Sequence, residues 1–145
     1  MSRFSQGTFY PTNPNKYIGK GEIFYRSSWE LTIMNKCDQH PDIINWASES
    51  IKIPYQDPFT GKRRTYIPDF FILFRDINGN KRGEILEVKP IRQSMIEAAK
   101  TKGDRYAVAI NTAKWKAADA FCKLYDNMTF KILTEQQIYR NTGRK

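Results

Sequence analysis

Apolar side chains recur at helical spacing in residues 26–41, RSSWELTIMNKCDQHP, where four of them share one stripe: Trp29, Ile33, Met34 and Cys37. Ser27, followed three positions later by Glu30, is typical of a capping box at the start of a helix. Pro41 cannot continue a helix because it lacks a backbone N–H. The pattern therefore predicts an amphipathic helix that begins near Ser27 and ends before Pro41.

Three segments instead show the alternating or continuous apolar pattern of β-strands. Residues 50–58 alternate over a few positions. Residues 66–74, YIPDFFILF, and residues 83–90, GEILEVKP, are both rich in apolar side chains. Asn78-Gly79 lies between them and is typical of a hairpin turn. The two segments are therefore predicted to pair as antiparallel strands.

The second half of the chain alternates predicted helices with short apolar segments. The pattern predicts a helix over 92–105 that ends near Gly103, a buried strand over 106–110, a helix over 111–127, a strand over 128–133 and a short helix over 134–140. This order predicts an α/β (α+β) fold with a central mixed β-sheet flanked by helices. Residues 1–24 show no period and predict an extended N-terminal arm, which leaves residues 25–145 as one domain.

The composition favours a globular protein with a polyanionic partner. Of 145 residues, 40% are hydrophobic and 14% aromatic, which is enough for a core. Lysine and arginine number 24 against 15 aspartates and glutamates, a net charge of +9. This charge suggests nucleic acid first and an anionic membrane surface second, while a merely cationic, soluble surface is the plain alternative.

Other features narrow the class of protein. We expect no signal peptide and no membrane span, because no stretch approaches the ~20 apolar residues that a span requires. Cys37 and Cys122 are expected to be reduced thiols in a cytoplasmic protein. With His40 as the single histidine, a four-ligand Cys/His zinc site and a pair of catalytic histidines are both excluded. Any metal chemistry would rest on carboxylates, which suit Mg²⁺ or Mn²⁺.

Two carboxylates and an ammonium stand within the predicted hairpin. Side chains alternate along a strand, so Glu87 and Lys89 share one face. Leu86 and Val88 point to the other face, which we take to be the core. Asp69 should pair near Glu87 or Lys89, where cross-strand neighbours lie about 5 Å apart. Carboxylates this close repel each other unless a cation lies between them, which indicates a divalent metal site.

Plainer interpretations of the acidic residues stay open. Asp69 follows Pro68 and would then only cap a turn, while Glu87 and Lys89 would form a weak ion pair on a solvated strand. Glu30 would be the acidic half of the capping box. Alternatively, Glu30 lies at the edge of the buried stripe, where an unpaired carboxylate is costly, and has a catalytic or metal-binding role.

These residues together carry a family resemblance. Pro68-Asp69 and Glu87-Val88-Lys89, after a helix with a glutamate, resemble the PD-(D/E)XK nuclease superfamily and its restriction-endonuclease-like core. The helix RSSWE, the strand IPY and residues 114–138 are similar to TnsA-type endonucleases. The segments QGTFYPTNPNKYIG, YRSSWE, HPDIINWASESIKIPY and EVKP resemble the head completion nucleases of large tailed phages over nearly the whole chain.

The resemblance implies a Mg²⁺-dependent DNA nuclease, with Mn²⁺ as a substitute ion. Asp69, Glu87 and the Val88 carbonyl would bind the metal, together with Glu30. Lys89 would orient or activate the attacking water, so the catalytic residues would be Glu30, Asp69, Glu87 and Lys89. The implied role is in phage head completion before tails join, with head, portal or neck proteins as partners, in the host cytoplasm or the virion.

Two alternatives to this function remain. One is a DNA-binding or structural head-completion factor that makes no use of its nuclease core. The other is a transposition or repair endonuclease that works with a partner protein. The first alternative predicts that Asp69→Ala leaves function unchanged. The second predicts cleavage only at defined ends or mismatches.

Basic residues around the acidic pair are candidates for DNA contacts, although any of them could be ordinary solvated surface. The set comprises Lys62, Arg63, Arg64, Arg92, Gln93, Lys100 and Lys114, with Lys102 and Lys116 as further candidates. Since nothing resembles a base-reading module, we expect salt-sensitive binding to double-stranded DNA with little sequence preference.

Overall fold

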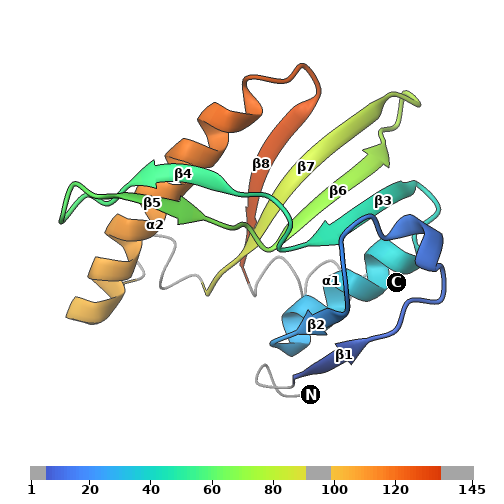
Figure 1. Ribbon diagram of the computed structural model, residues 1–145, viewed down its shortest axis with the longest axis horizontal. Helices are drawn as coiled ribbons and strands as arrows, with labels where there is room; N and C mark the ends of the chain where they lie inside the picture. The colour runs from blue at the N-terminus through green and yellow to red at the C-terminus, as the bar shows by residue number, and fades with distance from the viewer. Residues whose placement is uncertain (1–5, 91–98, 135–145) are drawn as a thin grey trace.

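A mixed four-stranded sheet forms the centre of the protein in a computed structural model, which describes residues 6–90 and 99–134 (Figure 1). Its strands lie in the order β3-β6-β7-β8, with only β7 and β8 parallel. Their bounds are Ile43–Ser48, Phe70–Arg75, Lys81–Val88 and Met128–Leu133. The expected α+β class with a central mixed sheet flanked by helices is confirmed.

Both faces of this sheet are buried. On one side α1 (Ser28–Gln39) packs its apolar stripe against a cluster that includes Leu86. On the other side α2 (Lys102–Cys122) packs over a second cluster that includes Ile85. The sequence pattern predicted a core only on the face of β7 that carries Leu86. The face that carries Ile85 is also buried. Glu87 points to this second face, so its carboxylate lies in the interior and is only 5% exposed.

The strand predicted over 66–74 is divided in the structure. β5 (Arg63–Tyr66) ends before Pro68, and β6 begins only at Phe70. Pro68 has no N–H to donate to a neighbouring strand, which explains the break. β5 pairs instead with β4 (Ile53–Gln56), and the two form a separate hairpin. Figure 1 shows this hairpin beside α2, and its buried side chains Ile53 and Tyr66 pack in the same cluster as Ile85 of the central sheet.

The described part of the segment predicted as an extended arm, residues 6–24, contains short elements. β1 (Gly7–Phe9) pairs with β2 (Ile23–Tyr25), and η1 (Pro14–Lys16) lies between them. Phe9 and Ile23 are buried in the cluster under α1. The carboxylate of Asp38, on α1, accepts backbone N–H groups from Thr12 and Asn13 at 2.9 Å each. The segment is thus held against α1 by both apolar burial and hydrogen bonds.

α2 replaces two predicted elements. The strand predicted over 106–110 is wrong, because these residues are helical. The buried positions Val108, Asn111, Trp115, Ala118 and Cys122 recur every three or four residues, so one stripe runs through the whole helix. Thr101 caps it by accepting the N–H of Asp104 at 2.9 Å, and Gly103 lies inside its first turn.

Some sequence predictions fall on residues that the structure does not describe. Half of the helix predicted over 92–105 (residues 92–98) and nearly all of the helix predicted over 134–140 lie there. In the described half, the helix end predicted near Gly103 is wrong, because α2 begins at Lys102. Cys37 and Cys122 are both buried and free of disulfides. Within residues 6–90 and 99–134, no helix has the length and apolarity needed to cross a membrane.

Candidate active site

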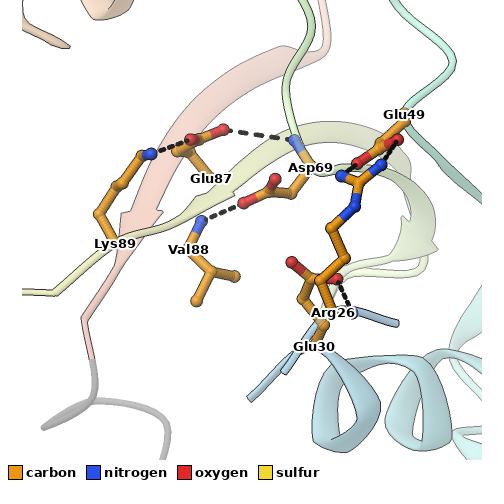
Figure 2. A network of polar contacts seen from close by, with 7 residues as sticks. All are labelled: Arg26, Glu30, Glu49, Asp69, Glu87, Val88 and Lys89. Atoms are coloured by element: carbon orange, nitrogen blue, oxygen red, sulfur yellow. Dashed lines mark hydrogen bonds and ion pairs between the residues drawn. The ribbon is translucent and has the colours of Figure 1, made fainter. Parts of the chain in front are cut away.

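The β6–β7 hairpin places Asp69 opposite Glu87. Phe70 pairs with Leu86 in the antiparallel register. Asp69, which precedes Phe70, therefore faces Glu87, which follows Leu86, at the open end of the hairpin. The backbone N–H of Asp69 donates to Oε1 of Glu87 at 3.3 Å, and the N–H of Val88 donates to Oδ2 of Asp69 at 2.8 Å (Figure 2). The expected pairing of Asp69 with the Glu87 segment is therefore confirmed.

The two carboxylates disturb each other's ionisation. Burial, followed by repulsion from Glu87, raises the pKa of Asp69 well above its usual range, although the Val88 N–H opposes the rise. Burial also raises the pKa of Glu87, against the stabilising effects of Tyr66 and Lys89. Because burial and mutual repulsion disfavour two negative charges here, a cation bound between the two carboxylates would stabilise their ionised forms.

The donor set of the pair suits a hard divalent cation. Asp69 and Glu87 offer carboxylate oxygens, which such ions prefer. The N–H of Val88 points toward Asp69, and in an extended strand the carbonyl of the same residue points to the same side. Among the described residues, however, no three side chains of His, Cys, Asp or Glu come together to hold a metal. The fit therefore rests on two carboxylates and a backbone carbonyl.

Glu30 lies beside this pair and also caps α1. Its backbone N–H donates to Oγ of Ser27 at 3.1 Å, as the capping-box pattern predicted. Its carboxylate accepts the backbone N–H of Arg26 at 2.9 Å. Burial raises the pKa of Glu30, and its negative charge is close enough to contribute to the raised pKa of Asp69. Its role as a metal ligand stays a prediction.

An ion pair between Arg26 and Glu49 lies next to Asp69, and no sequence pattern pointed to Glu49. The guanidinium of Arg26 binds both carboxylate oxygens of Glu49, with Nη2 at 3.2 Å from Oε1 (Figure 2). Glu49 has a φ of +50°, a left-handed conformation that costs a non-glycine residue about 1–3 kcal/mol. Its N–H donates to the carbonyl of Asp69 at 3.0 Å. The strained turn thus holds the backbone of the Asp69 segment.

Two cations and a tyrosine surround Glu87. The ammonium of Lys89 lies 3.6 Å from Oε2 of Glu87, and the Tyr66 hydroxyl donates to Oε1 at 2.8 Å. Lys114, on α2, lies over the ring of Tyr66 with its Nζ 5.7 Å from the centroid. Burial and the neighbouring Lys89 lower the pKa of Lys114. Sequence reasoning missed Tyr66, because its strand pairs with β4 and reaches Glu87 only through the tertiary fold.

Comparison with known proteins shows which family the chain belongs to. Residues 40–135 match the family model described as TnsA-like endonuclease N terminal. This range spans the sheet from β3 to β8 and includes Asp69, Glu87 and Lys89, whereas Glu30 precedes it. The chain belongs to the TnsA-like endonuclease family. The resemblance to PD-(D/E)XK nucleases noted in the sequence is therefore confirmed.

A curated relative supports the same assignment. The head completion nuclease of enterobacteria phage T4 is 34% identical over 140 residues, covering 89% of this chain and 90% of the relative. Endonuclease domains of this kind act on DNA and generally use divalent metals. The protein is thus a nuclease whose substrate is DNA.

The predicted DNA-contact residues of the endonuclease fall into separate groups. Lys62, Arg63 and Arg64 lie on the β4–β5 hairpin, where Arg64 forms an ion pair with Asp57 at 3.0 Å. Lys114 lies at the acidic pair itself. The remaining described candidates, Lys100, Lys102 and Lys116, are exposed before or along α2. Arg92 and Gln93 lie outside the described residues. Their contacts with DNA all remain predictions.

Proposed function

We propose that this endonuclease is a Mg²⁺-dependent deoxyribonuclease that acts in phage head completion, before heads and tails join, and that Mn²⁺ can substitute. The observation that carries the chemistry is the pair of Asp69 and Glu87 at one end of the β6–β7 hairpin, with Lys89 beside it. The head-completion role follows from the name and the near full-length match of the T4 relative.

The residues of the chain divide the work among them. Asp69, Glu87 and the Val88 carbonyl would hold the cation, with Glu30 close by. When bound, the cation would lower the pKa of a water molecule and offset charge on the phosphate. Lys89 orients the attacking water and donates to a phosphate oxygen, while Lys114 adds a second positive charge on the same side. Tyr66 fixes the position of the Glu87 carboxylate through its hydrogen bond.

The partners and location form part of the same proposal. Double-stranded DNA is the substrate form, and phage head, portal or neck proteins are the assembly partners, in the host cytoplasm or the virion. Residues 25–145 would form the catalytic domain, with residues 1–24 as an arm that lies against it. The net charge of +9 supports a polyanionic substrate.

The test is cleavage of supercoiled plasmid and of linear DNA, in Mg²⁺ and in EDTA, by the wild-type protein and Glu87→Ala. We expect metal-dependent cutting by the wild type and none by the variant, and the plasmid shows whether cutting needs an end. Glu84→Gln is a matched control, because Glu84 is on the same strand and its pKa is also raised by burial, but its side chain lies on the opposite face. DNA binding without cutting by the wild type would favour a structural head-completion factor.

Complementation tests the biological role separately. A phage that lacks its head completion nuclease should form tailed particles with the wild-type protein and not with Glu87→Ala. Rescue by both proteins would leave a structural role and reject a catalytic one. Metal-dependent cutting without rescue by either would point instead to a repair or transposition endonuclease.

A further inference from the structure

Two aromatic side chains stack on the surface at the far end of the β4–β5 hairpin. Phe59 lies in the turn and Tyr106 near the start of α2, with ring centroids 4.6 Å apart and planes 19° from parallel. They are 56% and 53% exposed, and neither ring belongs to the two buried clusters of the described residues. The packing of the core therefore does not account for this pair.

The hairpin turn is held in a fixed shape. Oδ1 of Asp57 accepts the N–H groups of Phe59 at 2.8 Å and Thr60 at 3.3 Å. The N–H of Gly61, at a φ of +73°, donates to the carbonyl of Asp57 at 2.8 Å. Oδ2 of Asp57 binds Nε of Arg64 at 3.0 Å. Because these bonds fix the loop in advance, presenting the Phe59 ring to a ligand costs little conformational entropy.

Basic residues lie close in sequence to both members of the aromatic pair. Lys62 and Arg63 on the hairpin and Lys102 and Arg105 on α2 are all exposed. The one acidic side chain of the turn, Asp57, is neutralised by Arg64. A groove of about 410 Å³ runs along the hairpin and is lined by Pro54, Tyr55, Gln56, Gly61 and Arg63. Exposed aromatics among cations suit nucleic acid, because phosphates bind the cations while bases stack on the rings.

This surface is connected to the active site by two rigid elements. β5 runs from the hairpin turn to Tyr66, which is bonded to Glu87. α2 runs from Tyr106 to Lys114, eight residues or about 12 Å along the helix. Figure 1 shows the hairpin and α2 side by side. A separation of this order corresponds to a few nucleotides of a DNA strand.

We propose that Phe59 and Tyr106 form a stacking platform for an unpaired or terminal base, a few nucleotides from the bond that is cut. The proposal rests on the DNA nuclease function above. Inside an intact duplex both faces of a base are covered by its neighbours, whereas a base in a single-stranded tail or at an end has a free face. The platform therefore makes the enzyme prefer DNA with unpaired bases next to the cleavage site.

Binding measurements test the platform without requiring cleavage. Asp69→Asn serves as the background, and two fluorescent DNAs of equal duplex length are compared at low salt in EDTA. In the first DNA, a non-nucleotide linker joins the two strands at each end, so no base end is free. The second DNA carries a single-stranded tail of five thymines. We expect Phe59→Ala and Tyr106→Ala to weaken binding of the tailed DNA by about tenfold, and binding of the closed DNA by less than twofold.

Further variants separate stacking from other effects. Phe59→Leu keeps an apolar contact with Tyr106 but has no aromatic face, so it should behave like Phe59→Ala, while Phe59→Trp should retain tight binding. Ile77→Ala is the matched control, because Ile77 is 100% exposed at the tip of the other hairpin. Lys62→Ala should weaken binding of both DNAs alike, since phosphates are common to both. Melting temperatures confirm that each variant is folded.

The outcomes distinguish this proposal from the proposed function. Equal loss on the two DNAs, or unchanged binding by Phe59→Leu, would overturn the stacking platform even if the wild-type enzyme cuts DNA. Tail-selective loss in the aromatic variants would support the platform, including in the case where the wild type binds but fails to cut. In that case only the nuclease mechanism would be rejected.

Discussion

The hydroxyl of Tyr66 donates a hydrogen bond of 2.8 Å to Oε1 of Glu87, and so joins the end of β5 to the end of β7. The same oxygen accepts the backbone N–H of Asp69 at 3.3 Å, while Lys89 approaches the other oxygen. Two groups from residues 66–69 and the ammonium of Lys89 thus stabilise one buried charge. The orientation of Glu87 is decided by β5 as much as by its own strand.

Tyr66→Phe should lower the affinity of the enzyme for Mg²⁺. A hydrogen bond to a charged group contributes about 1.5–3 kcal/mol, so its loss disfavours the ionised carboxylate that a cation needs. We expect the Mg²⁺ concentration for half-maximal cleavage to rise by roughly tenfold or more, with a smaller change at saturating Mg²⁺. Tyr55→Phe, on the paired strand β4, leaves the Tyr66–Glu87 bond in place and is the control. An unchanged metal dependence in Tyr66→Phe would show that this bond does not position the site.

Asp69→Asn should stabilise the metal-free protein at neutral pH. The folded-state pKa of Asp69 is raised, so its ionisation favours the unfolded state, and stability is lost as pH rises from the unfolded pKa through the folded one. Asparagine removes that loss and still accepts the N–H of Val88. We expect a gain of about 1 kcal/mol or more at pH 7 to 8 in EDTA, shrinking toward pH 4. Melting curves of both proteins across this range measure it, and a gain independent of pH would contradict the electrostatic cause.

Mg²⁺ should stabilise the wild type through the acidic pair. A ligand that binds only the native state adds about 2.7 kcal/mol at a concentration of one hundred times its Kd. We expect the melting temperature to rise with Mg²⁺ in the wild type and to stay constant in Asp69→Ala/Glu87→Ala. Glu84→Gln, which alters a carboxylate on the opposite face of β7, should respond like the wild type. Equal rises in the wild type and the double variant would place the metal elsewhere.

Ser27→Ala and Glu30→Gln should separate capping from catalysis. Ser27→Ala removes the acceptor for the Glu30 N–H and should cost about 1 kcal/mol of stability with little effect on cleavage. Glu30→Gln keeps an acceptor for the Arg26 N–H but removes the charge beside Asp69, so cleavage should fall at least tenfold with a nearly unchanged melting temperature. Full activity in Glu30→Gln would leave it with the capping role alone.

Local patterns succeeded where neighbouring residues decide the structure. The helix from Ser28 to Gln39, its Ser27 cap and the β6–β7 hairpin depend on contacts between residues close in sequence. β3 was missed because IINWAS becomes a strand only by pairing with β6. The strand predicted over 106–110 was wrong because the short apolar run was considered by itself. Val108 is the first buried position of a stripe that repeats at helical spacing as far as Cys122.

The sequence by itself determined the chemistry of this protein: an acidic pair with a lysine on one hairpin, a single histidine and a net charge of +9. Side-chain type and spacing of two or 3.6 residues carry that information directly. Only the tertiary structure decided which groups surround Glu87, how Glu49 and Arg26 lie against Asp69, and where Phe59 meets Tyr106. These contacts join elements far apart in the chain, and they form because packed apolar faces fix the elements relative to one another.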